Sequence, residues 1–136
     1  MTIYVHIGTH KTGSTTIQRA LRETSKLGVQ EGWEYLGKPT KVKELMKAQN
    51  YKEELVRIFS QWINNSIKRS GQSSKKIISS EALIGNPSIG YMNSRVVATM
   101  LCDALKHYDV KIIVYLRRQD EIIESLDKKI LVNADV

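Results

Sequence analysis

The sequence of 136 residues has few cysteines and no long apolar segment, and both absences limit what the protein can be. Its one cysteine, Cys102, excludes an internal disulfide framework and a cysteine-only metal site. No apolar run is long enough to span a bilayer, and residues 3–7 are too short and lack the basic leader of a signal peptide. We therefore expect a cytoplasmic protein, which a single cysteine also fits.

Acidic residues are in the minority, because Lys and Arg number 21 and Asp and Glu 14, giving a formal net charge of +7 at pH 7. This balance favours an anionic partner, such as a nucleotide, a sulfated or phosphorylated substrate, or nucleic acid. With 41% hydrophobic and 26% charged residues, the composition is that of a folded globular domain. The length predicts one domain, residues 1–136, with a single core.

Three segments have the composition of buried β-strands: residues 2–7, residues 76–79 and residues 110–116. Their apolar residues run on continuously rather than alternating, which predicts strands covered on both faces, as in a parallel sheet. A short fourth strand is a candidate at residues 33–36, inside a loop region at residues 28–39.

Between these strands, apolar residues recur at three- and four-residue spacing, which predicts amphipathic helices. Such stripes begin at Ile17, Leu55, Val97 and Ile122, and we expect them to form the core. The order of elements predicts an α/β fold in which a small parallel sheet of three to four strands lies between layers of helices. Because the edges of such a sheet are open, we also expect a homodimer that covers them.

Residues 3–21 place a glycine-containing turn between a strand and an amphipathic helix. Backbone N–H groups of the turn and of the new helix would converge near Ser14, and the positive end of the helix dipole would favour an anion there. Gly13 permits close approach of a phosphate or sulfate, and Lys11 adds a positive charge. The hydroxyls that can donate to the same anion belong to Thr12, Ser14, Thr15 and Thr16.

This turn does not match the G-x-x-x-x-G-K-[ST] loop of nucleotide triphosphatases. Gly8 and Gly13 have the required separation, but Ser14 occupies the lysine position, and Lys11 comes before the second glycine. This mismatch weakens the interpretation as a P-loop kinase or nucleotide hydrolase, which is therefore the alternative rather than the first hypothesis. Such an enzyme would require Mg²⁺-dependent ATP binding.

A second basic cluster follows the strand at residues 110–116. Arg117 and Arg118 come at the carboxyl end of this strand, where ligands bind in open α/β sheets. Arginine suits bidentate recognition of a phosphate. Ser125, eight positions after Arg117 on the next predicted helix, can donate to the same oxygens.

The string H-K-T-G-S-T-T at residues 10–16, after an apolar strand, resembles the 5′-phosphosulfate-binding loop of sulfotransferases. These enzymes use 3′-phosphoadenosine 5′-phosphosulfate (PAPS) as the sulfuryl donor. In that family an Arg at a strand end and a Ser eight positions later bind the 3′-phosphate, and Arg117 and Ser125 have this spacing. The resemblance implies a P-loop-like fold and sulfuryl transfer from PAPS to a hydroxyl or amine of a carbohydrate or small molecule.

The resemblance also implies roles for individual residues. Lys11 would stabilise charge on the leaving phosphate, and no metal would be required. Family members use a His or a Glu as the base, for which Glu81, just past the second strand, is the first candidate and His10 the second. The chain ends 11 residues after Ser125, where complete sulfotransferases continue, so we expect an incomplete donor-binding domain or a non-catalytic nucleotide- or anion-binding remnant.

Two other classes of site have little support. The lysines are spread along the chain rather than grouped with aromatic residues, so no stacking platform is visible and no nucleic-acid partner is expected. His6 and His10 lie four positions apart but lack an obvious third ligand, so no metal site is expected.

Overall fold

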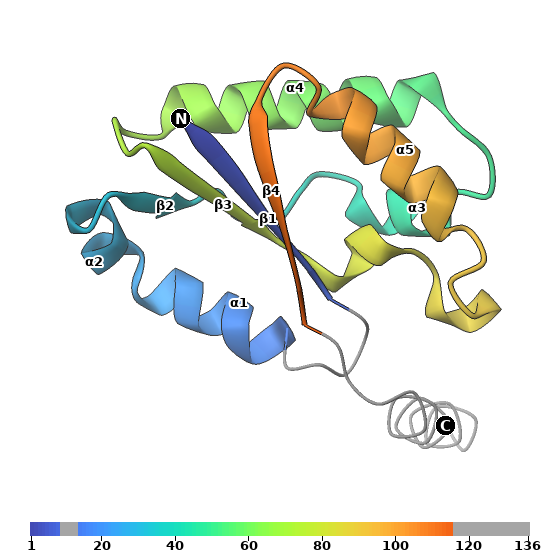
Figure 1. Cartoon of the computed structure of the whole chain (residues 1–136), viewed down its shortest axis with the longest axis horizontal. Helices are drawn as coiled ribbons and strands as arrows, with labels where there is room; N and C mark the ends of the chain where they lie inside the picture. Colours follow the sequence, from blue (N-terminus) through green and yellow to red (C-terminus); the bar gives the residue numbers. More distant parts are fainter. Residues whose placement is uncertain (9–13, 116–136) are drawn as a thin grey trace.

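The computed structural model describes residues 1–8 and 14–115, and the β-strands of this part form one parallel sheet (Figure 1). The strands are β1 (Thr2–Gly8), β2 (Trp33–Tyr35), β3 (Lys75–Ser79) and β4 (Asp109–Tyr115). Their order across the sheet is β2-β3-β1-β4. The prediction of an α/β fold with a small parallel sheet is confirmed, and so is the short strand near Trp33.

Helices connect the strands in the described part of the chain. They are α1 (Ser14–Glu23), α2 (Ser25–Gln30), α3 (Val42–Lys47), α4 (Glu53–Arg69), the 3-10 helices η1 (Glu81–Ile84) and η2 (Pro87–Ile89), and α5 (Ser94–Ala104). The stripes that begin at Ile17, Leu55 and Val97 form α1, α4 and α5, as predicted, whereas the stripe from Ile122 lies outside the described residues. The sequence does not predict α2 and α3, because six residues are too few to display a helical period.

The direction of the crossovers decides which helices cover which face of the sheet. The chain passes from β1 outward to β2, then returns through β3 and reaches β4 on the other side of β1. Because parallel crossovers are right-handed, α1 and α2 lie on one face, and α3, α4 and α5 lie on the other (Figure 1). The result is a three-layer α/β/α arrangement.

The main hydrophobic core lies between the sheet and the layer that contains α4 and α5. Ile3, Val5 and Ile78 are fully buried on this face of the sheet. They belong to one cluster with Leu55, Phe59 and Ile63 of α4 and with Val97, Met100 and Leu101 of α5. Burial of side chains of this size stabilises the fold by about 1.5–3 kcal/mol each, so this cluster holds the sheet on which the candidate site is built.

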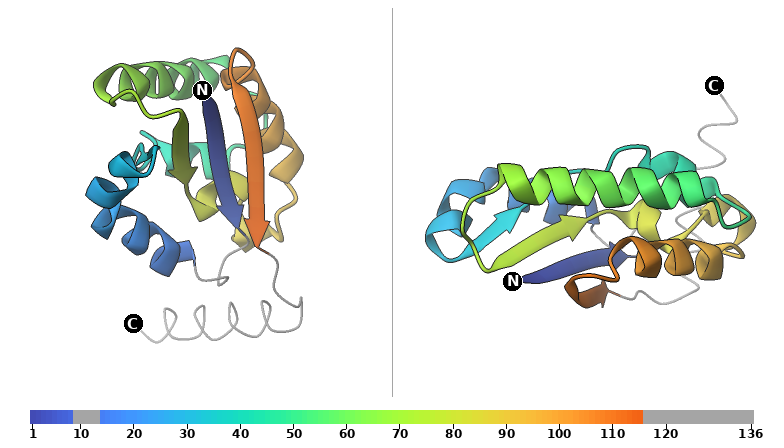
Figure 2. Two further views of the ribbon diagram at one scale, coloured as in Figure 1. Left: turned by 60° about the vertical axis from the view of Figure 1, so that its left-hand side comes forward. Right: turned by 90° about the horizontal axis from the view of Figure 1, so that it is seen from above.

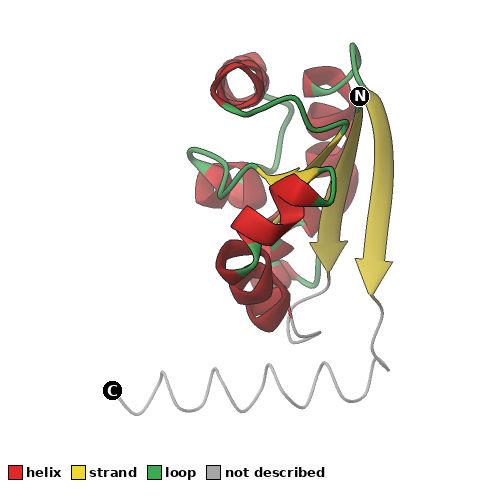
Figure 3. Ribbon diagram, turned by 90° about the vertical axis from the view of Figure 1, so that its left-hand side faces the viewer, coloured by secondary structure: helices red, strands yellow, loops and turns green. Residues whose placement is uncertain are grey.

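β4 departs from the prediction of strands covered on both faces. It lies at one edge of the described sheet (Figure 3), and Ile112, Val114 and Tyr115 remain 54%, 40% and 53% exposed. A continuous apolar run is therefore compatible with a half-covered edge strand, and the prediction is wrong for β4. The prediction holds better for β1, where Ile3 and Val5 on one face and His6 on the other are buried.

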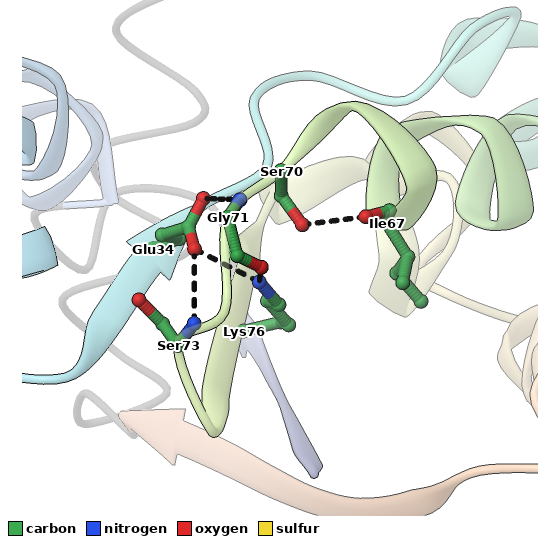
Figure 4. A network of polar contacts seen from close by, with 6 residues as sticks. All are labelled: Glu34, Ile67, Ser70, Gly71, Ser73 and Lys76. Carbon is green, nitrogen blue, oxygen red and sulfur yellow. Dashed lines mark hydrogen bonds and ion pairs between the residues drawn. The ribbon is translucent and has the colours of Figure 1, made fainter.

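A buried ion pair joins β2 to β3 (Figure 4). Lys76 is 1% exposed; its Nζ lies 2.9 Å from Glu34 Oε1 and donates to the Gly71 carbonyl oxygen at 2.9 Å. The backbone N–H groups of Gly71 and Ser73 donate to the Glu34 carboxylate at 2.8 and 3.4 Å. Burial by itself would raise the pKa of Glu34, but these hydrogen bonds and the Lys76 charge together lower it to about 2.

Candidate functional site at the carboxyl edge of the sheet

The carboxyl ends of β1 and β4 lie side by side at one edge of the sheet. The two strands are parallel and paired over their whole length, with Gly8 opposite Tyr115 (Figure 2, left, blue and orange). Lys11 comes three residues after Gly8, and Arg117 comes two residues after Tyr115. The two predicted anion-binding segments therefore follow, in the sequence, the neighbouring ends of two paired strands.

Most residues predicted to hold the donor lie outside the described residues: Lys11, Thr12, Gly13, Arg117 and Ser125. His10, the second candidate for the base, lies outside them as well. Within the described part, Ser14 and Thr15 open α1, and Thr16 in its first turn is exposed. The helix thus begins where the sequence predicts, and the first N–H groups of a helix have no acceptor within it. This end of α1 can therefore contribute backbone donors to an anion.

Glu81 lies at the same edge, one strand away from β1. It is the first residue of η1, separated from the last residue of β3 by Ser80, and is half-buried. Ser80 fixes this turn: its N–H donates to the carbonyl oxygen of His6 at 3.1 Å, and its Oγ accepts from the N–H of Ala82 at 3.3 Å. The structure thus brings η1, with Glu81 as its first residue, beside the end of β1.

His6 and Ser79 form a buried polar pair just below this edge. The imidazole is 3% exposed; its Nδ1 lies 2.7 Å from Ser79 Oγ, and the Tyr115 ring packs edge-on with centroids 5.4 Å apart. His6 Nε2 is buried and has no hydrogen-bond partner among the described residues. Desolvation lowers the pKa of His6, so the ring is neutral near pH 7. The sequence does not reveal this pair, because it depends on the register that sets His6 opposite Ser79.

A small cavity of about 270 Å³ opens beyond the end of β3, between α1 and α3; we call it the β3-end cavity. It is lined by Gln18, Lys38, Val42, Lys43, Met46, Ser80, Glu81 and Ala82. Val42 and Ala82 are buried, whereas Lys38 and Lys43 are exposed. Sequence analysis does not single out the two lysines, because only the folding of the crossovers brings them to Glu81. Among the described residues, cavities of about 530 and 430 Å³ are lined by none of the predicted site residues.

Residues 1–8 and 14–115 contain neither a candidate metal-binding cluster nor a helix able to span a membrane. No cluster of three or more His, Cys, Asp or Glu side chains there could hold a metal ion. In the same residues, no helix combines the length and apolar character needed to cross a membrane.

Comparison with known proteins assigns no family. No protein-family model, curated protein or solved structure matches the chain. The function must therefore be argued from the residues and their arrangement.

Proposed function

We propose that the chain binds PAPS and transfers its sulfuryl group to a hydroxyl or amine acceptor. The observation that carries the proposal is the parallel pairing of β1 with β4, which brings Gly8 and Tyr115 to the same edge. A donor with a phosphosulfate at one end and a 3′-phosphate at the other needs two anion sites within the span of one molecule. Lys11 and Arg117 follow these two neighbouring strand ends within three residues, so both sites can serve one ligand.

The donor would be held by two groups of residues. The phosphosulfate would be bound by Lys11, by the N–H groups around Gly13 and the start of α1, and by the hydroxyls of Thr12, Ser14, Thr15 and Thr16. The 3′-phosphate would be bound by the Arg117 guanidinium and the Ser125 hydroxyl. The positive net charge of the chain favours such a multiply charged ligand.

In the proposed reaction, the acceptor oxygen forms a bond to sulfur while Glu81 takes the hydroxyl proton. The bond between sulfur and the bridging phosphate oxygen breaks, and its electron pair stays with the leaving adenosine 3′,5′-bisphosphate. Lys11 stabilises the negative charge that develops on this phosphate. His10 is the second candidate for the base.

Titration calorimetry with adenosine 3′,5′-bisphosphate tests donor binding. We expect binding without Mg²⁺, and binding weaker by about tenfold or more for adenosine 5′-monophosphate, which lacks the 3′-phosphate. Lys11→Ala and Arg117→Ala should each weaken binding by about 1–3 kcal/mol, because each removes a charge-assisted hydrogen bond. Arg118→Ala is the matched control, and we expect it to keep the affinity of the unmodified chain.

Two outcomes would overturn the proposal. The first is a failure to bind the bisphosphate by a chain whose circular dichroism shows the folded state. The second is Mg²⁺-dependent binding of ATP in preference to the bisphosphate, which would favour a kinase or hydrolase.

Location and assembly remain predictions. Cys102 is an exposed free thiol, which fits the reducing cytoplasm in which we propose the protein acts. The exposed apolar side chains of the edge strand β4 fit a homodimer in which a second copy covers this edge. Light scattering at several protein concentrations measures the assembly state.

A further inference from the structure

We propose that the β3-end cavity binds the acceptor, and that the acceptor presents a sugar ring carrying a negative charge. This inference rests on the proposed function, because it takes Glu81 as the base. The cavity lies beyond the end of β3, which pairs directly with β1, and Gln18 on its wall belongs to the helix that begins at the predicted donor site. In open parallel sheets, ligands bind in this place, outside the carboxyl ends of neighbouring strands whose connections run in opposite directions.

The charges around the cavity point to an anionic ligand. Lys38 and Lys43 line it, and neither forms an ion pair with any residue that the structure describes. The nearby Lys41, by contrast, lies 4.0 Å from Glu44. Two lysines that line one cavity and have no carboxylate partner in the described part of the chain attract a negatively charged group.

Glu81 lines the same cavity without pairing with either lysine within the described part of the chain. The lining of the cavity therefore combines two lysines, which can bind an anion, with a carboxylate, which can accept the proton of a hydroxyl. A ligand that spans the space would place its negative group at Lys38 and Lys43 and its reacting hydroxyl at Glu81. This arrangement would hold the acceptor in one orientation, because reversing the ligand would bring its negative group against the carboxylate.

The remaining walls fit a sugar ring. Val42, Met46 and Ala82 supply apolar surface for the C–H face of a ring, and Gln18 and Ser80 supply polar groups for its hydroxyls. At about 270 Å³ the cavity lies just below the 300–1,000 Å³ typical of pockets for drug-sized ligands. It thus accommodates one ring. The negative group on that ring is either a carboxylate, as in a uronic acid, or a sulfate or phosphate ester.

A titration followed by NMR of the ¹⁵N-labelled full chain tests this inference with four probes: glucuronate, glucose 6-sulfate, glucose 6-phosphate and glucose. We expect the anionic sugars to shift the amide signals of residues 80–82 and of Lys43, and glucose to bind about tenfold more weakly or not at all. The tightest of the three anionic probes identifies whether the negative group is a carboxylate, a sulfate or a phosphate.

Variants test whether the lysines are responsible. The double variant Lys38→Ala/Lys43→Ala should lose about tenfold or more in affinity for the anionic sugars while its binding of adenosine 3′,5′-bisphosphate is retained. Lys47→Ala is the matched control, because Lys47 is an exposed lysine on the same helix that does not line the cavity. Thermal melting of each variant verifies the folded state.

The outcomes separate this inference from the proposed function. If the bisphosphate binds but charged and neutral sugars bind equally or not at all, the inference fails and the proposed function stands. If the anionic sugars bind through the two lysines but the bisphosphate does not bind, the cavity is a sugar site and the proposed function fails. Equal affinities of the double variant and of Lys47→Ala would also overturn the inference.

Discussion

Replacing Glu34 by glutamine is expected to reduce the free energy of unfolding by about 3–5 kcal/mol, because it leaves the Lys76 ammonium buried without a counter-charge. Lys76 is only 1% exposed, so its charge cannot reach water without opening the strand pair. Glutamine keeps the size of the side chain and one acceptor oxygen, so the loss combines the missing charge with a hydrogen bond that the second carboxylate oxygen accepted. In a domain of this size the loss corresponds to a fall in Tm of roughly 10–20 °C.

The pKa of Glu34 gives a second value for the contribution of this carboxylate to the free energy of unfolding. Burial acts to raise this pKa, but the hydrogen bonds from Gly71, Lys76 and Ser73 outweigh it and lower the pKa from 4.5 to about 2. Such a shift corresponds to about 3 kcal/mol, at 1.36 kcal/mol per pH unit. Because the folded pKa is the lower one, this stability is fully present above pH 4.5 and is lost as the pH falls toward 2. The Glu34→Gln variant should lack this part of the acid dependence.

Urea unfolding of Glu34→Gln, Lys76→Met and the double variant at pH 7 measures the coupling. We expect the double variant to be more stable than Glu34→Gln and the coupling energy to exceed about 2 kcal/mol, since no unpaired charge is then buried. Glu44→Gln is the control; it breaks the exposed Lys41–Glu44 pair at 4.0 Å and should cost less than about 1 kcal/mol. A Glu34→Gln loss no larger than that of the control, or additive single effects, would refute the reasoning.

Two further predictions concern buried polar groups near the candidate site. Asn93→Ala should lower the free energy of unfolding, measured in urea, by about 2–4 kcal/mol. The reason is that the buried Asn93 amide donates to the carbonyl oxygens of Met46 and Ala48 at 2.7 and 2.8 Å. An unchanged urea midpoint would contradict this prediction. Desolvation lowers the pKa of His6 from 6.5, so the unfolded chain binds the proton more tightly, and stability should fall as the pH drops from 7 toward 5. His6→Gln should flatten this decline, and parallel curves for the two proteins would argue against it.

Elements with a strong local pattern could be predicted from the sequence, and contacts between strands could not. The apolar stripe that begins at Leu55 predicts α4, and the apolar run after Met1 predicts β1, because each pattern is complete within one continuous segment. The ion pair of Glu34 with Lys76 depends on a strand register that only the folded sheet defines, and so does the contact of His6 with Ser79. In the sequence, Lys76 resembles any other surface lysine.

In the candidate site, too, residues with a local sequence signal could be predicted, and residues brought together by folding could not. Glu81 could be proposed from the sequence because it comes two residues after an apolar strand, and the carboxyl ends of parallel strands gather at one edge. Lys38 and Lys43 could not, because their proximity to Glu81 arises from the path between β2 and β3. The sequence likewise could not predict that β4 is only half-covered, since apolar composition does not distinguish an edge strand from a central one.

A crystal structure of the chain with adenosine 3′,5′-bisphosphate tests the central claim most directly. The account predicts one nucleotide across the carboxyl ends of β1 and β4, with its 5′-phosphate against Lys11 and the start of α1 and its 3′-phosphate against Arg117. A nucleotide bound elsewhere, or Lys11 and Arg117 on separate faces that no single nucleotide can bridge, would contradict it.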